Sequence, residues 1–455
     1  MHSRVLATVV LLASSFLPAL SYGEGQSSSG KSPVATKGKP IPPQYVPPVC
    51  QGRPLTVVPK AEMQAQAATE VKPNPPISKA DQLRLFNTLA KIINDVYVYP
   101  DFHGLPWPSI VAEYRAKVEK GLETEAFYAE MGKFVLKLGD EHSHFESPVQ
   151  VAADKASLAG DNNYVGIGAL FLPLLEKKRV TVLVVLPDSS AEHAGLKQHD
   201  SLFAVDGFPM VQNGKAYQLR TRGPECSAAV LTLQSPGQLP RDLTVVRAAI
   251  AAPVPIYARL VPTTDGSRIG YIFLPTFFDL TIPAQVKKAL ADFGPLDGLI
   301  LDNRMNGGGS GKVVMSMLSY FTSGALGSLV SRTASRPLEI AADPVGNSQK
   351  VPLVVLVSKS TVSYGEIFAG ILQDTGRARI LGQTTAGRVE TLHGYTFADG
   401  SQAWLAQERF DPIHSHADWE RRGIQPDVEV HADWDTFTFE NDPALAAAVK
   451  SLGHR

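Results

Sequence analysis

The chain has 455 residues, of which 44% are hydrophobic and 19% are charged, and its formal net charge is −1. A chain of this length can form two or three domains that each bury a core. The near-neutral charge provides no electrostatic basis for binding nucleic acid or an anionic membrane surface, so we expect neither partner. Neither composition nor charge indicates an oligomeric state.

The N-terminus has the pattern of an export signal. His2 and Arg4 precede an apolar run from Val5 to Leu20, and the small residues at the end of this run suit signal cleavage. A membrane anchor is the alternative, but the run is short for a span and Pro18 lies near its end. We therefore expect residues 1–21 to be removed, which leaves an exported protein, periplasmic or secreted, without an integral membrane segment.

The remaining chain divides into five segments of different composition. Residues 22–77 are rich in Pro, Ser and Gly and are typical of a linker, whereas residues 78–150 have helical periodicity. Residues 160–250 predict short strands with one short helix. Residues 251–435 alternate strands with helices, and residues 436–455 form a C-terminal tail or helix. The alternation predicts a mixed α/β fold in which helices cover a parallel or mixed sheet, with helices over residues 282–293, 312–321 and 366–375.

Cys50 and Cys226 are the two cysteines of the chain. In an exported protein they could form one disulfide, but two separate thiols are equally compatible with the sequence. The sequence contains neither a Cys-x-x-Cys nor a His-Glu-x-x-His motif, so we expect no metal and no other cofactor.

A strand-to-helix junction carries the most chemical information. The apolar run Val351–Val357 predicts a strand, and Ser360–Gly370 begins the next helix. A serine hydroxyl at such a junction lies beside the positive end of the helix dipole and near free backbone N–H groups, which can serve a nucleophile and a developing oxyanion together. The alternative is that the serines and threonine of this stretch only cap the helix.

The middle segment resembles a PDZ domain of the circularly arranged bacterial type. The resemblance is carried by three stretches, Tyr164–Ala169, Pro187–Leu196 and Asp200–Gly207. It implies that the segment binds extended peptide tails as an added strand, with Gly166, Ile167 and Gly168 in the loop that receives the peptide. The alternative is that these glycines only form a turn.

With this middle segment in place, the chain resembles the carboxyl-terminal processing (tail-specific) serine protease family over residues 79–430. The resemblance rests on motifs that occur in the family's order: Leu138–Ser143 with Ser147-Pro148, Ile269–Ile272 with Phe277, Leu299–Gly309, Ser363 with Glu366–Ala369, and Gly423–Asp427. It implies an α/β protease core of the crotonase-like type. It also implies that Ser363 is the nucleophile and that the N–H groups of Gly308 and Tyr364 bind the oxyanion.

The chain departs from the family pattern at the position of the lysine base, which Arg388 occupies. Arginine keeps its proton at ordinary pH and cannot act as a general base. Tricorn-like relatives instead use a histidine before the PDZ domain and a glutamate near the end, and His142 and Glu420 match these positions. A histidine with a pKa near 6.5 suits proton transfer, and the acid could orient it. Alternatively, His142 is structural, Glu420 is a surface charge, and Arg388 binds a peptide or forms an ion pair.

The resemblance therefore predicts an exported serine endopeptidase. It would recognise the accessible C-termini or exposed segments of protein and peptide substrates through the PDZ domain and cleave them through an acyl-enzyme at Ser363. The alternative is a catalytically inactive peptide- or ligand-binding protein on the same scaffold, which the replacement of the lysine by Arg388 favours.

Overall fold

The structure is a computed structural model that describes residues 42–61, 63, 73–140, 142–158, 164–250 and 253–453. The predicted export signal and much of the predicted linker lie outside the described residues. Among the residues that are described, no helix has the length and apolar character needed to cross a membrane.

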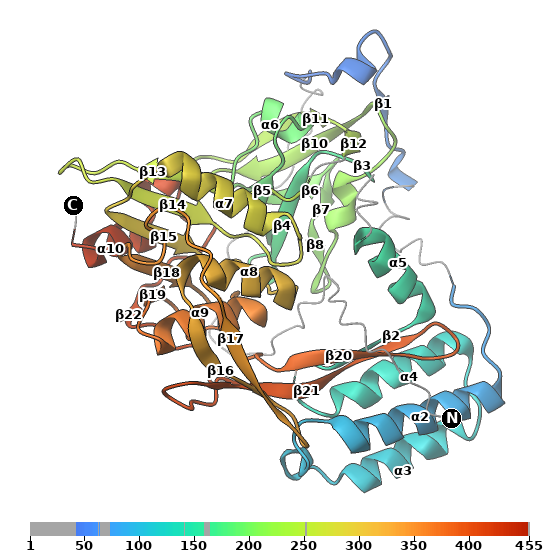
Figure 1. The fold of residues 1–455 in the computed structure, drawn as a ribbon. Coiled ribbons are helices and arrows are strands. Elements are labelled where there is room, and N and C mark those ends of the chain that lie inside the picture. The colour runs from blue at the N-terminus through green and yellow to red at the C-terminus, as the bar shows by residue number, and fades with distance from the viewer. Residues whose placement is uncertain are drawn as a thin grey trace, which may run out of the picture.

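Helices form the N-terminal part of the described chain, as the periodicity predicts. They are α2 (Lys79–Val96), α3 (Trp107–Val118), α4 (Thr124–Leu136) and, after a short strand β2 (His144–Glu146), α5 (Pro148–Leu158). Ser78 caps α2, because its side chain accepts the N–H of Asp81. Figure 1 shows α2, α3 and α4 lying together beside the hairpin of β20 (Thr391–Thr396) and β21 (Gln402–Pro412). The helices and the hairpin share one hydrophobic core, so elements from opposite ends of the sequence pack together.

The middle part of the chain forms a seven-stranded sheet with the path β1-β10-β6-β5-β4, and β11 and β7 pair beside it. A disulfide joins Cys50 to Cys226, and the adjacent β1 pairs in parallel with β10. The elements are β1 (Thr56–Val57), β3 (Tyr164–Gly166), β4 (Ala169–Leu174), β5 (Arg179–Val185), α6 (Ser190–His193), β6 (Ser201–Val205), β7 (Phe208–Pro209), β8 (Val211–Gln212), β9 (Lys215–Ala216), β10 (Ser227–Gln234), β11 (Arg241–Val246) and β12 (Ala248–Ile250).

The C-terminal part contains a six-stranded sheet in the order β13-β14-β15-β18-β19-β22. From β14 onward the neighbours pair in parallel, and β13 pairs antiparallel at one edge. The strands are β13 (Tyr257–Val261), β14 (Ile269–Phe273), β15 (Gly298–Asp302), β18 (Leu353–Val357), β19 (Arg379–Gly382) and β22 (Val428–Glu429). The predicted mixed α/β fold is therefore confirmed.

Helices cover both faces of this sheet. On one face α7 (Ile282–Phe293), α8 (Gly311–Phe321) and α9 (Tyr364–Asp374) pack in the largest hydrophobic cluster, and on the other face lies α10 (Pro443–Ser451). A second sheet has the order β17-β16-β21-β2 with β20 beside β21, and its remaining strands are β16 (Gly324–Val330) and β17 (Ser335–Ile340). Because β14, β15 and β18 run in parallel, the turns after β15 and β18 meet at one edge of the main sheet, where open α/β sheets usually bind ligands.

Candidate active site

Ser363 occupies the junction between β18 and α9. It is the N-cap residue of α9 and has φ 55° and ψ −127°, a backbone conformation that costs energy for any residue other than glycine. The residue is 8% exposed and lies at the positive end of the α9 dipole. A strained turn between a strand and a helix that presents a serine at a helix N-terminus is also the arrangement of the nucleophile elbow of hydrolases.

Glu366 joins Ser363 to the loop that follows β19. Its side chain is fully buried and accepts the Ser363 N–H at 3.0 Å. The same carboxylate accepts the Gly387 N–H at 2.7 Å and the Arg388 N–H at 2.9 Å, and it also accepts the Thr385 hydroxyl. Burial raises the pKa of Glu366, and these hydrogen bonds oppose the rise. The carboxylate therefore fixes the serine and the 385–388 loop in one geometry.

The turn after β15 lies directly against Ser363. Gly308 has φ 93°, and a Cβ atom there would lie 2.8 Å from Ser363 Cβ and 3.2 Å from the Tyr364 nitrogen. Only glycine permits this approach. The structure therefore brings together Ser363, Gly308 and Tyr364. In this structure the Gly308 N–H donates to Asn306 Oδ1 at 3.0 Å, so an oxyanion at Gly308 would have to share or replace the Asn306 contact.

A buried ion pair supports this turn. Arg304 donates to both carboxylate oxygens of Asp302, at 2.9 and 2.6 Å, and to both of Asp442, at 3.2 and 2.5 Å. All three side chains are buried, and Asp442 is the N-cap residue of α10. Two-pronged arginine–carboxylate pairs hold a fixed geometry, so α10 helps to position the residues that precede Gly308.

Arg388 is linked both to the Ser363 helix and to His142. Its backbone N–H is held by Glu366, and its positive charge lowers the pKa of His142. Lys312 and Lys359, the lysines nearest in sequence to the two turns, are both exposed. The site therefore has a permanent guanidinium charge at the position where the family pattern has a lysine base.

His142 belongs to a turn that is anchored on β21. Its backbone N–H donates to Asp140 Oδ1 at 2.9 Å, and the Ser143 hydroxyl accepts the Ala406 N–H at 2.9 Å. The His142 side chain is 16% exposed, and its Nδ1 lies 4.0 Å from Glu390 Oε2. Burial lowers the pKa of His142 to about 4. The imidazole is therefore neutral at pH 7 and able to accept a proton.

Glu420 is not a surface charge, so that alternative interpretation is wrong. The residue is 5% exposed and accepts the Val389 N–H at 2.8 Å. Its carboxyl group also hydrogen-bonds the carboxyl group of Glu390. Burial and this contact raise the pKa of Glu420 far above its usual range. The structure thus connects Glu420 with the surroundings of His142 through Glu390.

Glu390 is a site residue that the sequence interpretation missed. It is 2% exposed, lies one residue before β20, and faces His142 and Glu420. No motif marks it. One feature of the sequence could have identified Glu390. It lies three residues after Gly387, and it is an acidic residue between Val389 and Thr391 at the start of a strand.

The predicted peptide-binding loop, residues 166–168, forms backbone hydrogen bonds with other segments of the β-rich part of the chain. Gly166 pairs with Ala248 in the ladder of β3 and β12. The carbonyl groups of Ile167 and Gly168 accept N–H groups at 2.9 Å from Ala191 and Leu186, respectively. A Cβ atom on Gly168 would lie 2.3 Å from Ser189 Cβ, so the loop packs tightly on the residues around α6.

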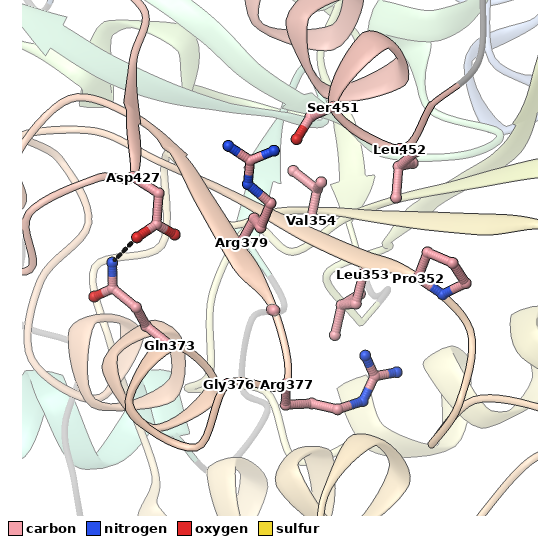
Figure 2. Close-up of a pocket in the computed structure, with 11 residues that line it drawn as sticks. Pro352, Leu353, Val354, Gln373, Gly376, Arg377, Arg379, Asp427, Ser451 and Leu452 are labelled. Carbon is pink, nitrogen blue, oxygen red and sulfur yellow. Dashed lines mark hydrogen bonds between the residues drawn. The ribbon is translucent and has the colours of Figure 1, made fainter. Parts of the chain in front are cut away.

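A separate pocket of about 570 Å³ lies at the amino ends of β18 and β19. Figure 2 shows Gln373 and Asp427 on its wall, joined by a hydrogen bond of 2.9 Å. Because Ser363 follows the carboxyl end of β18, this pocket is not part of the candidate active site.

Comparison with known proteins agrees with this geometry. Residues 268–430 match the model of peptidase family S41, and residues 78–131 match that of the Tricorn protease C1 domain. The chain therefore carries a peptidase family S41 domain and is a serine-type peptidase.

Its relatives include carboxyl-terminal-processing proteases. The chain is 27% identical over 360 residues to one from Synechocystis, which covers 78% of this chain and 82% of that protein. It is 29% identical over 365 residues to a chloroplastic C-terminal processing peptidase from Tetradesmus obliquus, with 76% of each chain covered. A solved photosystem II D1 C-terminal processing protease aligns with a TM-score of 0.54 and 25% identity, covering 77% of this chain and 93% of that chain.

Proposed function

We propose that this peptidase is an endopeptidase in which Ser363 is the nucleophile and His142 is the general base. The observation that carries the proposal is the loop of residues 385–390. At one end Glu366 binds this loop and the Ser363 N–H, and at the other end Glu390 lies beside a buried, neutral His142. Serine hydrolysis needs the nucleophile and the base within hydrogen-bond reach of each other, and a loop that contacts the supports of both residues favours such a pairing.

The reaction follows from these roles. The proton of Ser363 Oγ passes to His142 as Oγ attacks the carbonyl carbon of the substrate, and the carbonyl oxygen becomes an oxyanion. The Tyr364 N–H at the start of α9 and the Gly308 N–H stabilise that oxyanion. Protonated His142 then donates its proton to the leaving amine, which leaves an acyl group on Ser363. Water, activated by His142, hydrolyses this ester and restores the enzyme.

We further propose that the β-rich unit is a PDZ domain that recognises substrate C-termini or exposed segments. Among the described strands β4 pairs only with β5, so one edge of the sheet is open to an added strand. The relatives named for C-terminal processing support a C-terminal substrate segment. The proposed domain limits are those predicted from the sequence. They are 78–150 for the helical region, 160–250 for the PDZ domain, 251–435 for the protease core and 436–455 for the C-terminal tail or helix.

Export to the periplasm or outside the cell also belongs to the proposal. It is supported by the signal-like residues 1–21 and by the disulfide between Cys50 and Cys226, since disulfides persist in oxidising compartments. The same disulfide holds part of the predicted linker against the β-rich unit, and this part forms β1, so residues 50–57 are structured and the linker prediction is wrong for them.

The test is a time course of cleavage of an unstructured protein by the chain from residue 22 onward. Wild-type protein should cleave it, and Ser363→Ala and His142→Ala should each lower the rate by about 1,000-fold or more. Ser415→Ala and His414→Ala alter exposed residues of the same types and serve as matched controls. If the folded wild-type chain left the protein intact, catalysis would be excluded and the binding-protein alternative would take its place.

A further inference from the structure

Two buried polar atoms face each other beside the proposed base. His142 Nδ1 and Glu390 Oε2 lie 4.0 Å apart, and within the described part of the structure neither has a hydrogen-bond partner. Unpaired polar atoms are uncommon in protein interiors because leaving them unsatisfied destabilises the fold. Hydrogen bonds of catalytic groups often shorten when substrate binds, so a pair at this separation is poised to form one.

We propose that Glu390, and not Glu420, is the residue that orients His142, and that Glu420 acts on His142 only by holding Glu390. This inference rests on the proposed function, because it assigns the partner of the proposed base. Glu390 is a positioning residue in this account: it acts through the imidazole and does not touch the substrate.

Tyr99 and Val389 hold the two glutamates in place beside the imidazole. The Tyr99 hydroxyl donates to Glu390 Oε1 at 3.2 Å, which occupies the other carboxylate oxygen. The Val389 N–H donates to Glu420 Oε2 at 2.8 Å and so anchors Glu420 one residue away from Glu390. Glu420 is therefore held next to Glu390.

The two carboxyl groups divide their roles by sharing one proton. A hydrogen bond between two carboxyl groups requires a proton on one of them. Burial raises the pKa of both groups, and their mutual hydrogen bond raises the pKa of Glu420 but lowers that of Glu390. Burial raises the pKa of Glu390 to about 7 and that of Glu420 to about 11, so Glu390 is the member of the pair that loses its proton first as the pH rises, while Glu420 keeps its proton and donates.

Other titratable groups lie around His142, Glu390 and Glu420, on the elements that pack against them. Burial is the main influence on the pKa of His142, and the charges around the three residues act in both directions. These groups are Tyr97, Tyr99, Asp140, His144 and Arg388, and Asp418 acts on the same cluster through Tyr99. Asp140 and a hydrogen bond of the imidazole with the Glu390 backbone raise the pKa of His142, whereas Arg388 and His144 lower it.

This arrangement selects a tautomer. A carboxylate at Glu390 accepts a hydrogen bond from Nδ1–H of His142, which leaves Nε2 unprotonated and free to take the Ser363 proton. When that proton has moved to Nε2, the Glu390 charge stabilises the imidazolium. Without the carboxylate the imidazole can carry its hydrogen on Nε2, where it cannot accept the serine proton.

The experiment compares Glu390→Gln with Glu420→Gln in the mature chain. An amide at position 390 can present its NH2 group to Nδ1 and favour the wrong tautomer, so kcat should fall by about 100- to 10,000-fold with KM little changed. An amide at position 420 imitates a protonated acid, because it can still donate to Glu390 and accept the Val389 N–H, so kcat should fall less than about tenfold. The reverse order of the two effects would overturn the inference.

Glu408→Gln is the matched control. Glu408 is a buried glutamate of β21 that pairs with His393 at 3.0 Å and with Arg336 at 2.7 Å, so this variant tests the general cost of changing a buried, ion-paired glutamate. Thermal unfolding of all three variants separates loss of folding from loss of catalysis.

A second readout does not depend on activity. ¹⁵N NMR of the imidazole nitrogens at neutral pH should show the Nδ1–H tautomer for His142 in wild type and Glu420→Gln, and a loss of this preference in Glu390→Gln. An Nε2–H tautomer in wild type would overturn the inference. If wild type showed the Nδ1–H tautomer but cleaved nothing, the proposed function would fail while the assignment of Glu390 would stand.

Discussion

Glu366 fixes the position of Ser363 by accepting its backbone N–H at 3.0 Å from within the same turn of α9. The φ of 55° at Ser363 is unfavourable for a serine, and a buried carboxylate that also binds the 385–388 loop counteracts this cost. The family motif that contains both residues therefore has a structural explanation: the acid supports the conformation that presents the hydroxyl.

Replacing Glu366 by Gln should impair both stability and catalysis. The carboxylate accepts four hydrogen bonds, whereas an amide would turn an NH2 group towards buried donors. We expect a loss of about 1–3 kcal/mol in the free energy of unfolding and a fall in kcat of more than tenfold. Urea denaturation and steady-state kinetics measure the two effects. Glu339→Gln changes an exposed glutamate of β17 and is the control; equal behaviour of the two variants would contradict this role of Glu366.

Gly308→Ala should abolish most activity, while Gly307→Ala should have a much smaller effect. A Cβ atom at Gly308 would approach Ser363 Cβ to 2.8 Å at a φ of 93°, whereas a Cβ atom at Gly307 would meet nothing within 4 Å. We expect a fall in kcat of about 100-fold or more for Gly308→Ala, the size typical of losing an oxyanion donor, and less than about tenfold for Gly307→Ala. Steady-state cleavage rates of the two variants measure this difference. Similar losses in both would argue against a specific role for Gly308.

Acid should destabilise the protein partly through His199. This histidine is packed against Trp434 and Phe437, and burial lowers its pKa to about 4. Between about pH 6.5 and pH 4 the unfolded chain binds the proton and the folded chain does not, so stability falls as the pH is lowered through this range, by about 3 kcal/mol from this residue. Urea denaturation at several pH values measures the slope.

His199→Gln should flatten that slope without moving the acid limb of kcat/KM, which we assign to His142. For His142 a pKa of about 4 predicts that activity rises as the pH increases through about 4 and stays high at pH 7. An acid limb that moved with His199→Gln would contradict the assignment.

Loss of the Cys50–Cys226 disulfide should destabilise the β-rich unit. The bond links residues 176 positions apart and anchors the segment that supplies β1. We expect Cys50→Ser together with Cys226→Ser to lower the free energy of unfolding by about 2–5 kcal/mol. Calorimetry of the unfolding transition, with and without a reductant, measures the change. If the reductant left the unfolding of the wild-type protein unchanged, the bond would not stabilise the fold.

Local pattern sufficed for much of the fold. The helix predicted over residues 282–293 coincides with α7, and α8 and α9 lie within two residues of their predicted starts. The periodicity of hydrophobic residues and the alternation of strands and helices are local features, so they can be recognised in a single sequence. The same holds for the strand-to-helix junction itself, although the sequence left Ser360, Thr361 and Ser363 as candidate caps and it is the structure that makes Ser363 the N-cap residue.

The surroundings of His142 could not be predicted in the same way. Glu390 faces His142 because β2 and β20 both pair with β21, and the pairing of β2 with β21 joins residues more than 250 positions apart. Glu420 could be a surface charge or a buried acid until the Val389 N–H and the Glu390 carboxyl group were found beside it. The motif Leu299–Gly309 marks the turn that contains Asn306 and Gly308, but it does not show that the Asn306 side chain accepts the Gly308 N–H.

The central claim, that Ser363 is a nucleophile activated by His142, is tested most directly by covalent labelling. The mature chain would be incubated with a fluorophosphonate at pH 7 and the modified peptide identified by mass spectrometry. The account predicts one adduct, on Ser363, formed at least about 100-fold more slowly in His142→Ala. An adduct elsewhere, no adduct on folded protein, or equally fast labelling of Ser363 in His142→Ala would contradict it.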